Sequence, residues 1–154
     1  MRKTFPRCFP GLLVVVTACG VGASEQAEPP AVESRFEAGQ VWSYENREGE
    51  DQSRVLVERV GRLADTATVV HIQIIRVAVA SRFQPSGVQD IIPHVAIAED
   101  VLDASVLELK DEVVSPVGFA SAYGAWLQTV ESGEASYYTM SVAEIVDLVE
   151  RAVN

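Results

Sequence analysis

Residues 67–80 read ATVVHIQIIRVAVA, and this run decides the fold class. It is rich in β-branched residues, which is typical of a buried β-strand. The apolar side chains occupy first one parity and then the other: Val70, Ile72 and Ile74, followed by Ile75, Val77 and Val79. His71 and Gln73 share the less apolar parity of the first half. Because alternate side chains of a strand point to opposite faces, this phase change predicts a β-bulge near Ile74 and Ile75.

Two shorter strands are expected before this run. Residues 40–45, QVWSYE, place Trp42 and Tyr44 on one face, and residues 53–60 read SRVLVERV. The segment between them, ENREGED, contains a glycine and several acidic residues. Two short strands joined by such a turn indicate an antiparallel hairpin.

A long loop is expected after the run. Residues 81–97, SRFQPSGVQDIIPHVAI, contain Pro85, Gly87 and Pro93, which interrupt any regular pattern. Long ordered loops often carry function. Asp90 and His94, with Glu99 just beyond, are therefore the candidate site side chains of this loop.

Two helices are predicted next. The first has Glu99 and Asp100 in its first turn, where acidic residues favour a helix. One side of it carries Val101, Leu102, Ser105, Val106 and Leu109. The second is predicted to start with Ser115 as N-cap and Pro116 at the first helical position, and to end at Gly133. Its apolar stripe consists of Phe119, Tyr123, Trp126, Leu127 and Val130.

The chain is expected to close with a short strand and a helix. Residues 136–140, SYYTM, favour a strand. Ser141 and Glu144 form a capping-box pattern that predicts a helix start. The apolar face of this helix contains Ile145, Val146, Val149 and Val153. Three strands, two helices, a strand and a helix predict an α+β fold, with a small mostly antiparallel sheet and helices on one face.

Residues 1–18 have the layout of an export signal. Three basic residues, Arg2, Lys3 and Arg7, precede an apolar run at residues 9–16. This run is much shorter than the roughly 20 apolar residues that a bilayer-spanning helix needs. A permanent membrane span is therefore not expected here.

Residues 16–19, Val-Thr-Ala-Cys, resemble the lipobox of bacterial lipoproteins. The resemblance implies cleavage between Ala18 and Cys19, and acyl chains such as palmitate on Cys19, which would anchor the protein in the lipid bilayer of the cell envelope. Gly20 lacks the aspartate that retains many lipoproteins in the inner membrane, so the outer membrane, facing the periplasm, is favoured in a Gram-negative cell. The alternative is a soluble secreted protein, cut after Ala18 or at residues 21–23.

The segment after Cys19 predicts a tether, and the rest of the chain a single domain. Residues 20–34, GVGASEQAEPPAVES, lack periodicity, so residues 19–34 are expected to form the lipid anchor and a disordered tether. Residues 35–154 suit one globular α+β domain with one core. The chain has two cysteines, and Cys8 leaves with the signal. The domain is therefore expected to have no internal disulfide.

The charge of the chain limits its partners. The chain has 12 Lys and Arg residues against 22 Asp and Glu residues. Removal of Arg2, Lys3 and Arg7 with the signal leaves 9 bases against 22 acids, a formal charge of −13. Such a surface repels nucleic acid and would attract a cationic partner, although an acidic surface also serves plain solubility.

Three stretches of the domain resemble a small bacterial domain family that is uncharacterised. They are GQVWSYENREGE, TVVHIQI and IPHVAIAEDVLDAS, and the resemblance extends from Phe36 onward. It implies a single compact domain, and it transfers no activity and no site residues. Where that family has a serine before the acidic pair of the first helix, this chain has Ala98.

The residues offer little catalytic chemistry. Zinc sites normally use three or four ligands, whereas the domain has only His71 and His94, so no metal and no cofactor is expected. His71 is interpreted as a hydrogen-bonded sheet residue. Asp90 and His94 with a serine would imitate a hydrolase triad, but no G-x-S-x-G elbow is present. The acidic pair Glu99 and Asp100 is interpreted as helix surface.

Three hypotheses on function follow. The first is a non-enzymatic envelope lipoprotein that binds another envelope component or protein. The second is an acidic inhibitor or immunity-type protein that acts on a cationic exported enzyme. The third is a hydrolase that uses His94 as its base. An enzyme is the less favoured class, because no catalytic set is evident.

Overall fold

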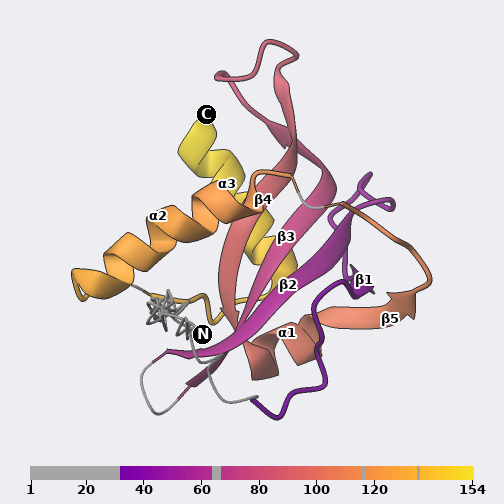
Figure 1. Cartoon of the computed structure of the whole chain (residues 1–154). Coiled ribbons are helices and arrows are strands. Elements are labelled where there is room, and N and C mark those ends of the chain that lie inside the picture. The colour runs from indigo at the N-terminus through magenta and orange to yellow at the C-terminus, as the bar shows by residue number, and fades with distance from the viewer. Residues whose placement is uncertain (1–31, 64–66, 116, 135) are drawn as a thin grey trace, which may run out of the picture. The chain divides into compact units, whose positions relative to one another are not determined.

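The computed structural model describes residues 32–63, 67–115, 117–134 and 136–154 (Figure 1). The expected signal, the cleavage point at Ala18, the anchor Cys19 and residues 20–31 lie outside the described residues. The described residues form five strands and three helices, which confirms the α+β class. In chain order these elements are β1 (Val41–Tyr44), β2 (Arg54–Leu63), β3 (Ala67–Ala80), β4 (Val88–Ala98), α1 (Glu99–Ser105), β5 (Val106–Lys110), α2 (Phe119–Glu131) and α3 (Val142–Val153).

The five strands form one antiparallel sheet in the order β4-β3-β2-β1-β5. Strands β1 to β4 follow one another as a meander, which includes the predicted hairpin of β1 and β2. Strand β5 then returns to pair with β1, with Leu109 opposite Trp42. Antiparallel neighbours need only short connections, so the local hairpins account for most of this topology.

Strand β3 is the longest of the five strands, and it shows the predicted phase change. Every position from Val69 to Ile75 is buried, whereas beyond this point only alternate residues are. Arg76 has a positive φ of 57°, and the register with β4 shifts between Ile75 and Val79. The bulge therefore lies just after the expected position.

The buried first half of β3 has cover on both faces. Val70, Ile72 and Ile74 belong to the main core, which also contains Ile145 and Val146 of α3. On the other face, the ring of His71 contacts Tyr123 and Trp126 of α2. In Figure 1, α3 crosses behind the sheet and α2 lies in front of it. The expectation that the helices share one face was thus wrong for α2.

The segment expected to be a long loop is mostly strand β4. Only residues 81–87 form the turn, which is closed by a hydrogen bond from the Ser81 amide to the Gly87 carbonyl (2.9 Å). Pro93 favoured the prediction of a loop, because proline lacks the N–H that a strand donates to its neighbour. The register between β3 and β4 shifts between Val95 and Ile92, so Pro93 occupies a bulge, where proline is tolerated.

The first predicted helix is shorter than expected. Helix α1 ends at Ser105, and the next five residues form β5 instead of a further turn. Val106 and Leu109 fit both periodicities, but Val106 is buried whereas Leu109 is half exposed. Pairing with β1 satisfies the backbone groups of β5 that face β1, and it outweighs the local helical pattern.

The second helix starts later than predicted. Its N-cap is Gly118, in the left-handed region with a φ of 75°, and not Ser115. Pro116 lies outside the described residues. The positive φ of Gly118 is why glycine suits the position, since a Cβ there would meet Pro93 only at contact distance, 3.4 Å. The positive φ of Gly133 agrees with the predicted helix end.

The structure of the last segment largely matches the prediction from its sequence. Helix α3 has the predicted capping box, in which Ser141 and Glu144 exchange side-chain and backbone hydrogen bonds. Of the predicted strand at residues 136–140, the described part forms one parallel bridge, between Tyr138 and Ile97 of β4.

Candidate functional site

Two histidines from neighbouring strands form a hydrogen-bonded pair. The Nδ1 atom of His71 on β3 lies 3.0 Å from the Nε2 atom of His94 on β4. The two rings are stacked with an interplanar angle of 17°. One of these nitrogens must donate and the other accept, so the pair shares a single proton between the facing atoms.

Helix α2 covers this pair with aromatic side chains. Tyr123 and Trp126 meet the His71 ring edge-on, with centroids 4.9 and 4.7 Å away, and Phe119 lies 5.7 Å from the His94 ring. Three residues of the predicted apolar stripe of α2 thus contact the imidazole rings of this pair.

Neighbours on β2 complete the surroundings of the pair. The guanidinium of Arg59 lies 5.7 Å from the Tyr123 ring. Gly61 lies beside the imidazole of His71, where a Cβ would be in ordinary contact with Nε2 at 3.8 Å. The result is a packed aromatic cluster around two neutral histidines.

Burial keeps both histidines neutral. Burial, together with the nearby His94 and Arg59, lowers the pKa of His71 to about 3, and burial lowers the pKa of His94 to about 4. An acid–base catalyst at neutral pH needs a pKa near that pH. The pair is therefore suited to packing and not to proton transfer at neutral pH.

The structure does not bring the three candidate loop residues together. His94 bonds to His71, while the carboxylate of Glu99 accepts a hydrogen bond from Ser34 at 2.5 Å. Asp90 is an exposed residue of β4, and four residues along a strand span about 13 Å. Within the described ranges, no group of three or more His, Cys, Asp or Glu side chains could hold a metal ion.

Gln73 is a buried polar residue that was not among the candidate site residues. Its Nε2 donates to the carbonyl oxygens of Pro93 (3.1 Å) and Val117 (2.6 Å), and its Oε1 accepts from the Val117 amide (3.2 Å). The side chain thus fixes the segment that leads into α2. A glutamine inside an apolar strand was the available signal.

A charged network joins the turn after β1 to β3 and α3. The Arg47 guanidinium binds the carboxylates of Glu50 (2.5 Å), Asp147 (3.0 Å) and Glu150 (2.6 Å). These bonds raise the pKa of Arg47, although burial opposes the shift. Glu50 and Glu150 also accept bonds from the backbone amides of Ala78 and Ala80. The network holds structure together, since each charge already has a partner.

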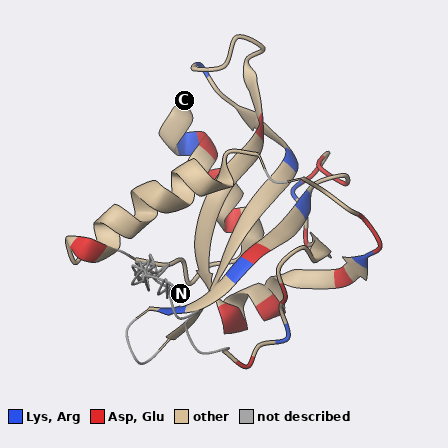
Figure 2. Ribbon diagram, viewed as in Figure 1, with Lys and Arg blue, Asp and Glu red and all other residues tan. Residues whose placement is uncertain are grey.

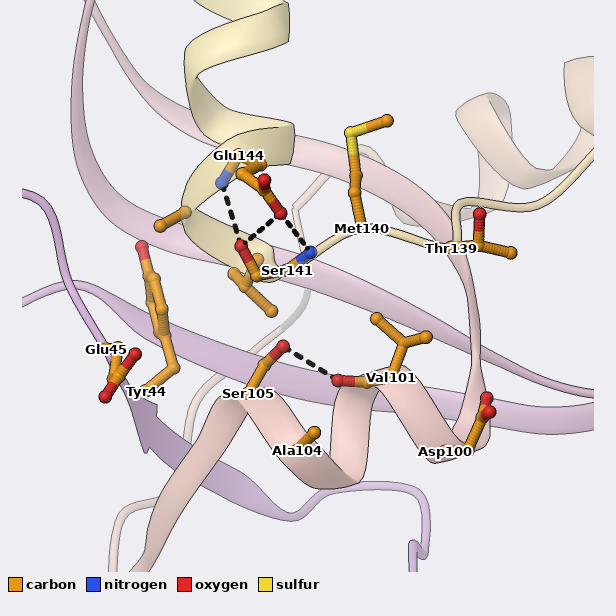
Figure 3. A pocket seen from close by; sticks show the side chains of 12 residues that line it. Tyr44, Glu45, Asp100, Val101, Ala104, Ser105, Thr139, Met140, Ser141 and Glu144 are labelled. Carbon is orange, nitrogen blue, oxygen red and sulfur yellow. Dashed lines mark hydrogen bonds between the residues drawn. The ribbon is translucent and has the colours of Figure 1, made fainter.

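A pocket of about 460 Å³ lies among the end of β1, α1 and the first turn of α3 (Figure 3). Its carboxylates are Glu45, which directly follows β1, Asp100 of α1 and Glu144 of α3. Its other lining residues are Tyr44, Val101, Ala104, Ser105, Thr139, Met140, Ser141, Val142 and Ala143. The lining therefore combines acidic groups with small and apolar side chains, and it contains no basic residue.

Helix positions account for two of the three acidic groups of this pocket. Hydrogen bonds from the Ser141 side chain and backbone lower the pKa of Glu144. Asp100 and Glu144 each occupy the first turn of a helix, where the helix dipole favours them. Glu45 belongs to no helix. Two further pockets, of about 420 and 570 Å³, are also lined by Asp100.

Charge is unevenly distributed over the described residues (Figure 2). Helix α2 is uncharged until Glu131 in its last turn.

No helix in the described ranges has the length and apolar character needed to cross a membrane.

Comparisons with protein-family models, with curated proteins and with solved structures found no match to this chain.

Proposed function

We propose that this protein is a non-enzymatic, membrane-tethered binding protein of the cell envelope, and that the pocket beside α1 receives a positively charged group of a protein partner. The observation that carries the proposal is the lining of that pocket. Glu45, Asp100 and Glu144 surround it, and none of its lining residues is basic.

The rest of the lining suits a lysine or arginine side chain. Val101 and Met140 offer apolar surface to an aliphatic stem, while the carboxylates at the same pocket attract the charged end. Opposite charges at a partly enclosed site interact more strongly than in open water. The acidic composition of the whole chain adds long-range attraction for a cationic partner.

The tether is the second part of the proposal. It rests on the resemblance of residues 16–19 to a lipobox, and it makes Cys19 the lipid attachment site. The intact mass and membrane partition of the native protein, compared with a Cys19→Ser variant, test it. Acyl mass and membrane retention that disappear in the variant are expected. An unacylated N-terminus at Ser24 would instead indicate a soluble secreted protein.

An acidic inhibitor of a cationic exported enzyme is a second candidate function. The same pocket favours it, since an inhibitor needs a site for a basic side chain of its target. Electrostatic steering would then make association fast at low salt and slower at high salt. Inhibition assays against basic cell-wall hydrolases separate this candidate from a binding protein without inhibitory action.

A hydrolase based on His94 has less support. The hydrogen-bond partner of His94 is another histidine, and burial holds its pKa near 4. If His94→Ala abolished an enzymatic activity of the native protein while the fold was retained, the binding proposal would be overturned in favour of this one.

The pocket is tested directly by an NMR titration of the isotope-labelled protein with a lysine-rich peptide. We expect amide shifts at Val101 and Ala143 that weaken with salt. The double variant Glu45→Gln/Asp100→Asn should lose them. Glu131→Gln, which removes a carboxylate outside the pocket, should retain them. Equal shifts with a glutamate-rich peptide of the same length would contradict the proposal.

A further inference from the structure

The two edges of the sheet differ in whether another segment bonds to their backbone. On the β4 edge, the Tyr138 amide donates to the Ala96 carbonyl at 2.7 Å, and the Ala98 amide donates to the Tyr138 carbonyl at 2.9 Å. On the opposite edge, β5 pairs with β1 and has no second neighbour among the described strands. An uncovered edge strand offers its backbone to another strand.

The exposed edge strand also carries exposed apolar side chains. Leu107 is 63% exposed and Leu109 is 50% exposed, and both belong to the same parity of β5. Val113, just beyond the strand, is fully exposed. Apolar side chains gathered at an unpaired edge mark an interaction surface more strongly than isolated exposed leucines do.

The backbone of Leu109 faces outward. The Ser43 hydroxyl of β1 donates to the Glu108 carbonyl at 3.2 Å, so this carbonyl faces β1. Because backbone groups alternate in direction along a strand, the N–H and C=O of Leu109 face the open edge. They are placed to bond to a strand that is added there.

We propose that two copies of this protein associate through β5, antiparallel to each other, about a two-fold axis that passes through Leu109. The two Leu109 backbones then exchange hydrogen bonds. Leu109 of each copy lies opposite its equivalent and diagonal to Leu107, so that the exposed leucines cover one another.

Charge favours this register over the two neighbouring symmetric registers. A two-fold axis through Leu109 places Glu108 of each copy opposite Lys110 of the other. An axis through Glu108 would place two glutamates face to face, and an axis through Lys110 would place two lysines face to face. Opposite charges across a strand pair stabilise it, and like charges destabilise it. Within each copy Lys110 already forms an ion pair with Glu108, so the dimer would hold a four-membered charge network.

The association is expected to be weak and dependent on concentration. A strand of five residues pairs few backbone groups, and small interfaces are typical of transient complexes. The exposed edge therefore serves reversible pairing and not an obligate dimer.

Sedimentation velocity over a concentration series tests this inference. The full chain is used with Cys8→Ser and Cys19→Ser, so that neither a disulfide nor an acyl group joins two copies. We expect a monomer–dimer equilibrium. Lys110→Glu, which opposes two glutamate pairs across the interface, should weaken it about tenfold or more.

A charge reversal on both sides makes the test specific. The double variant Glu108→Lys/Lys110→Glu restores opposite charges and should recover most of the wild-type affinity. Leu109→Lys should abolish the dimer, whereas Val88→Lys, at an exposed apolar residue of β4, should not. A wild-type protein that stays monomeric throughout, a dimer that survives Leu109→Lys, or a double variant no better than Lys110→Glu would each overturn the inference.

Discussion

His71 and His94 lie on neighbouring strands, with Nδ1 of the first 3.0 Å from Nε2 of the second. Only one proton fits between these two atoms. The pair is therefore compatible with two neutral rings and incompatible with two charged ones, and this makes the stability of the domain sensitive to acid.

We expect the free energy of unfolding to fall as the pH drops below about 6.5. Burial lowers the pKa values of His71 and His94 to about 3 and 4, so the unfolded chain binds protons first. The stabilisation is fully present above the unfolded pKa and is lost toward the folded ones. Each histidine should account for about 2 kcal/mol between pH 7 and pH 5. Chemical denaturation across this range measures the slope.

The double variant His71→Leu/His94→Leu is the control for this slope. It removes both titrating groups, so its stability should depend much less on pH over the same range. An unchanged slope in the double variant would assign the acid sensitivity to other groups.

Gln73→Leu should destabilise the protein by about 2 to 4 kcal/mol, because it removes the hydrogen-bond partners of both backbone groups of Val117. Hydrogen exchange of the Val117 amide should become faster as well. Gln128→Leu is the matched control, since Gln128 is exposed on α2 and its replacement should change stability by less than about 0.5 kcal/mol. Equal effects of the two changes would show that the bonds to Val117 contribute little.

Arg47→Met should cost about 2 to 4 kcal/mol, because it leaves the buried carboxylate of Glu50 without its guanidinium. Arg47→Lys should recover only part of this loss, since one ammonium group cannot bind three carboxylates in the same geometry. Thermal and chemical denaturation measure both variants. Arg82→Met, in the exposed turn between β3 and β4, should be nearly neutral.

Ser141→Ala should destabilise α3 by about 1 kcal/mol through loss of its N-cap. Glu144→Gln should have little effect by comparison, because an amide oxygen also accepts the bond from the Ser141 backbone. Denaturation midpoints, supported by hydrogen exchange of the first turn of α3, test both. A larger loss for the glutamine variant than for the alanine variant would contradict the capping argument.

The elements that sequence predicted well are those specified by neighbouring residues. The long apolar run of β3 and the capping box of Ser141 and Glu144 depend on residues that are close along the chain. Strand β4 was not predicted because proline usually interrupts a strand. The register with β3 shows that Pro93 occupies a bulge, where it is tolerated. The end of α1 was missed because Val106 and Leu109 suit a helix and a strand equally, and only pairing with β1 distinguishes the two.

The candidate sites depend on contacts between distant parts of the chain. His71 was correctly interpreted as a hydrogen-bonded sheet residue, but its partner follows from the register of β3 and β4. The pocket brings together Glu45, Asp100 and Glu144, which come from three separate parts of the chain. The contact of Arg47 with Asp147 joins residues 100 positions apart. No local sequence pattern predicts such pairs.

The return of β5 to the first strand also has a consequence for how the chain folds. The meander of β1 to β4 closes through contacts that are local in sequence, whereas Ser43 and Glu108 are separated by 65 positions. Contacts across long loops form more slowly than local ones. As the chain is synthesised from its N-terminus, the outer edge of β1 has no partner strand until Lys110 has emerged, so the incomplete meander exposes an edge that is open to wrong pairing.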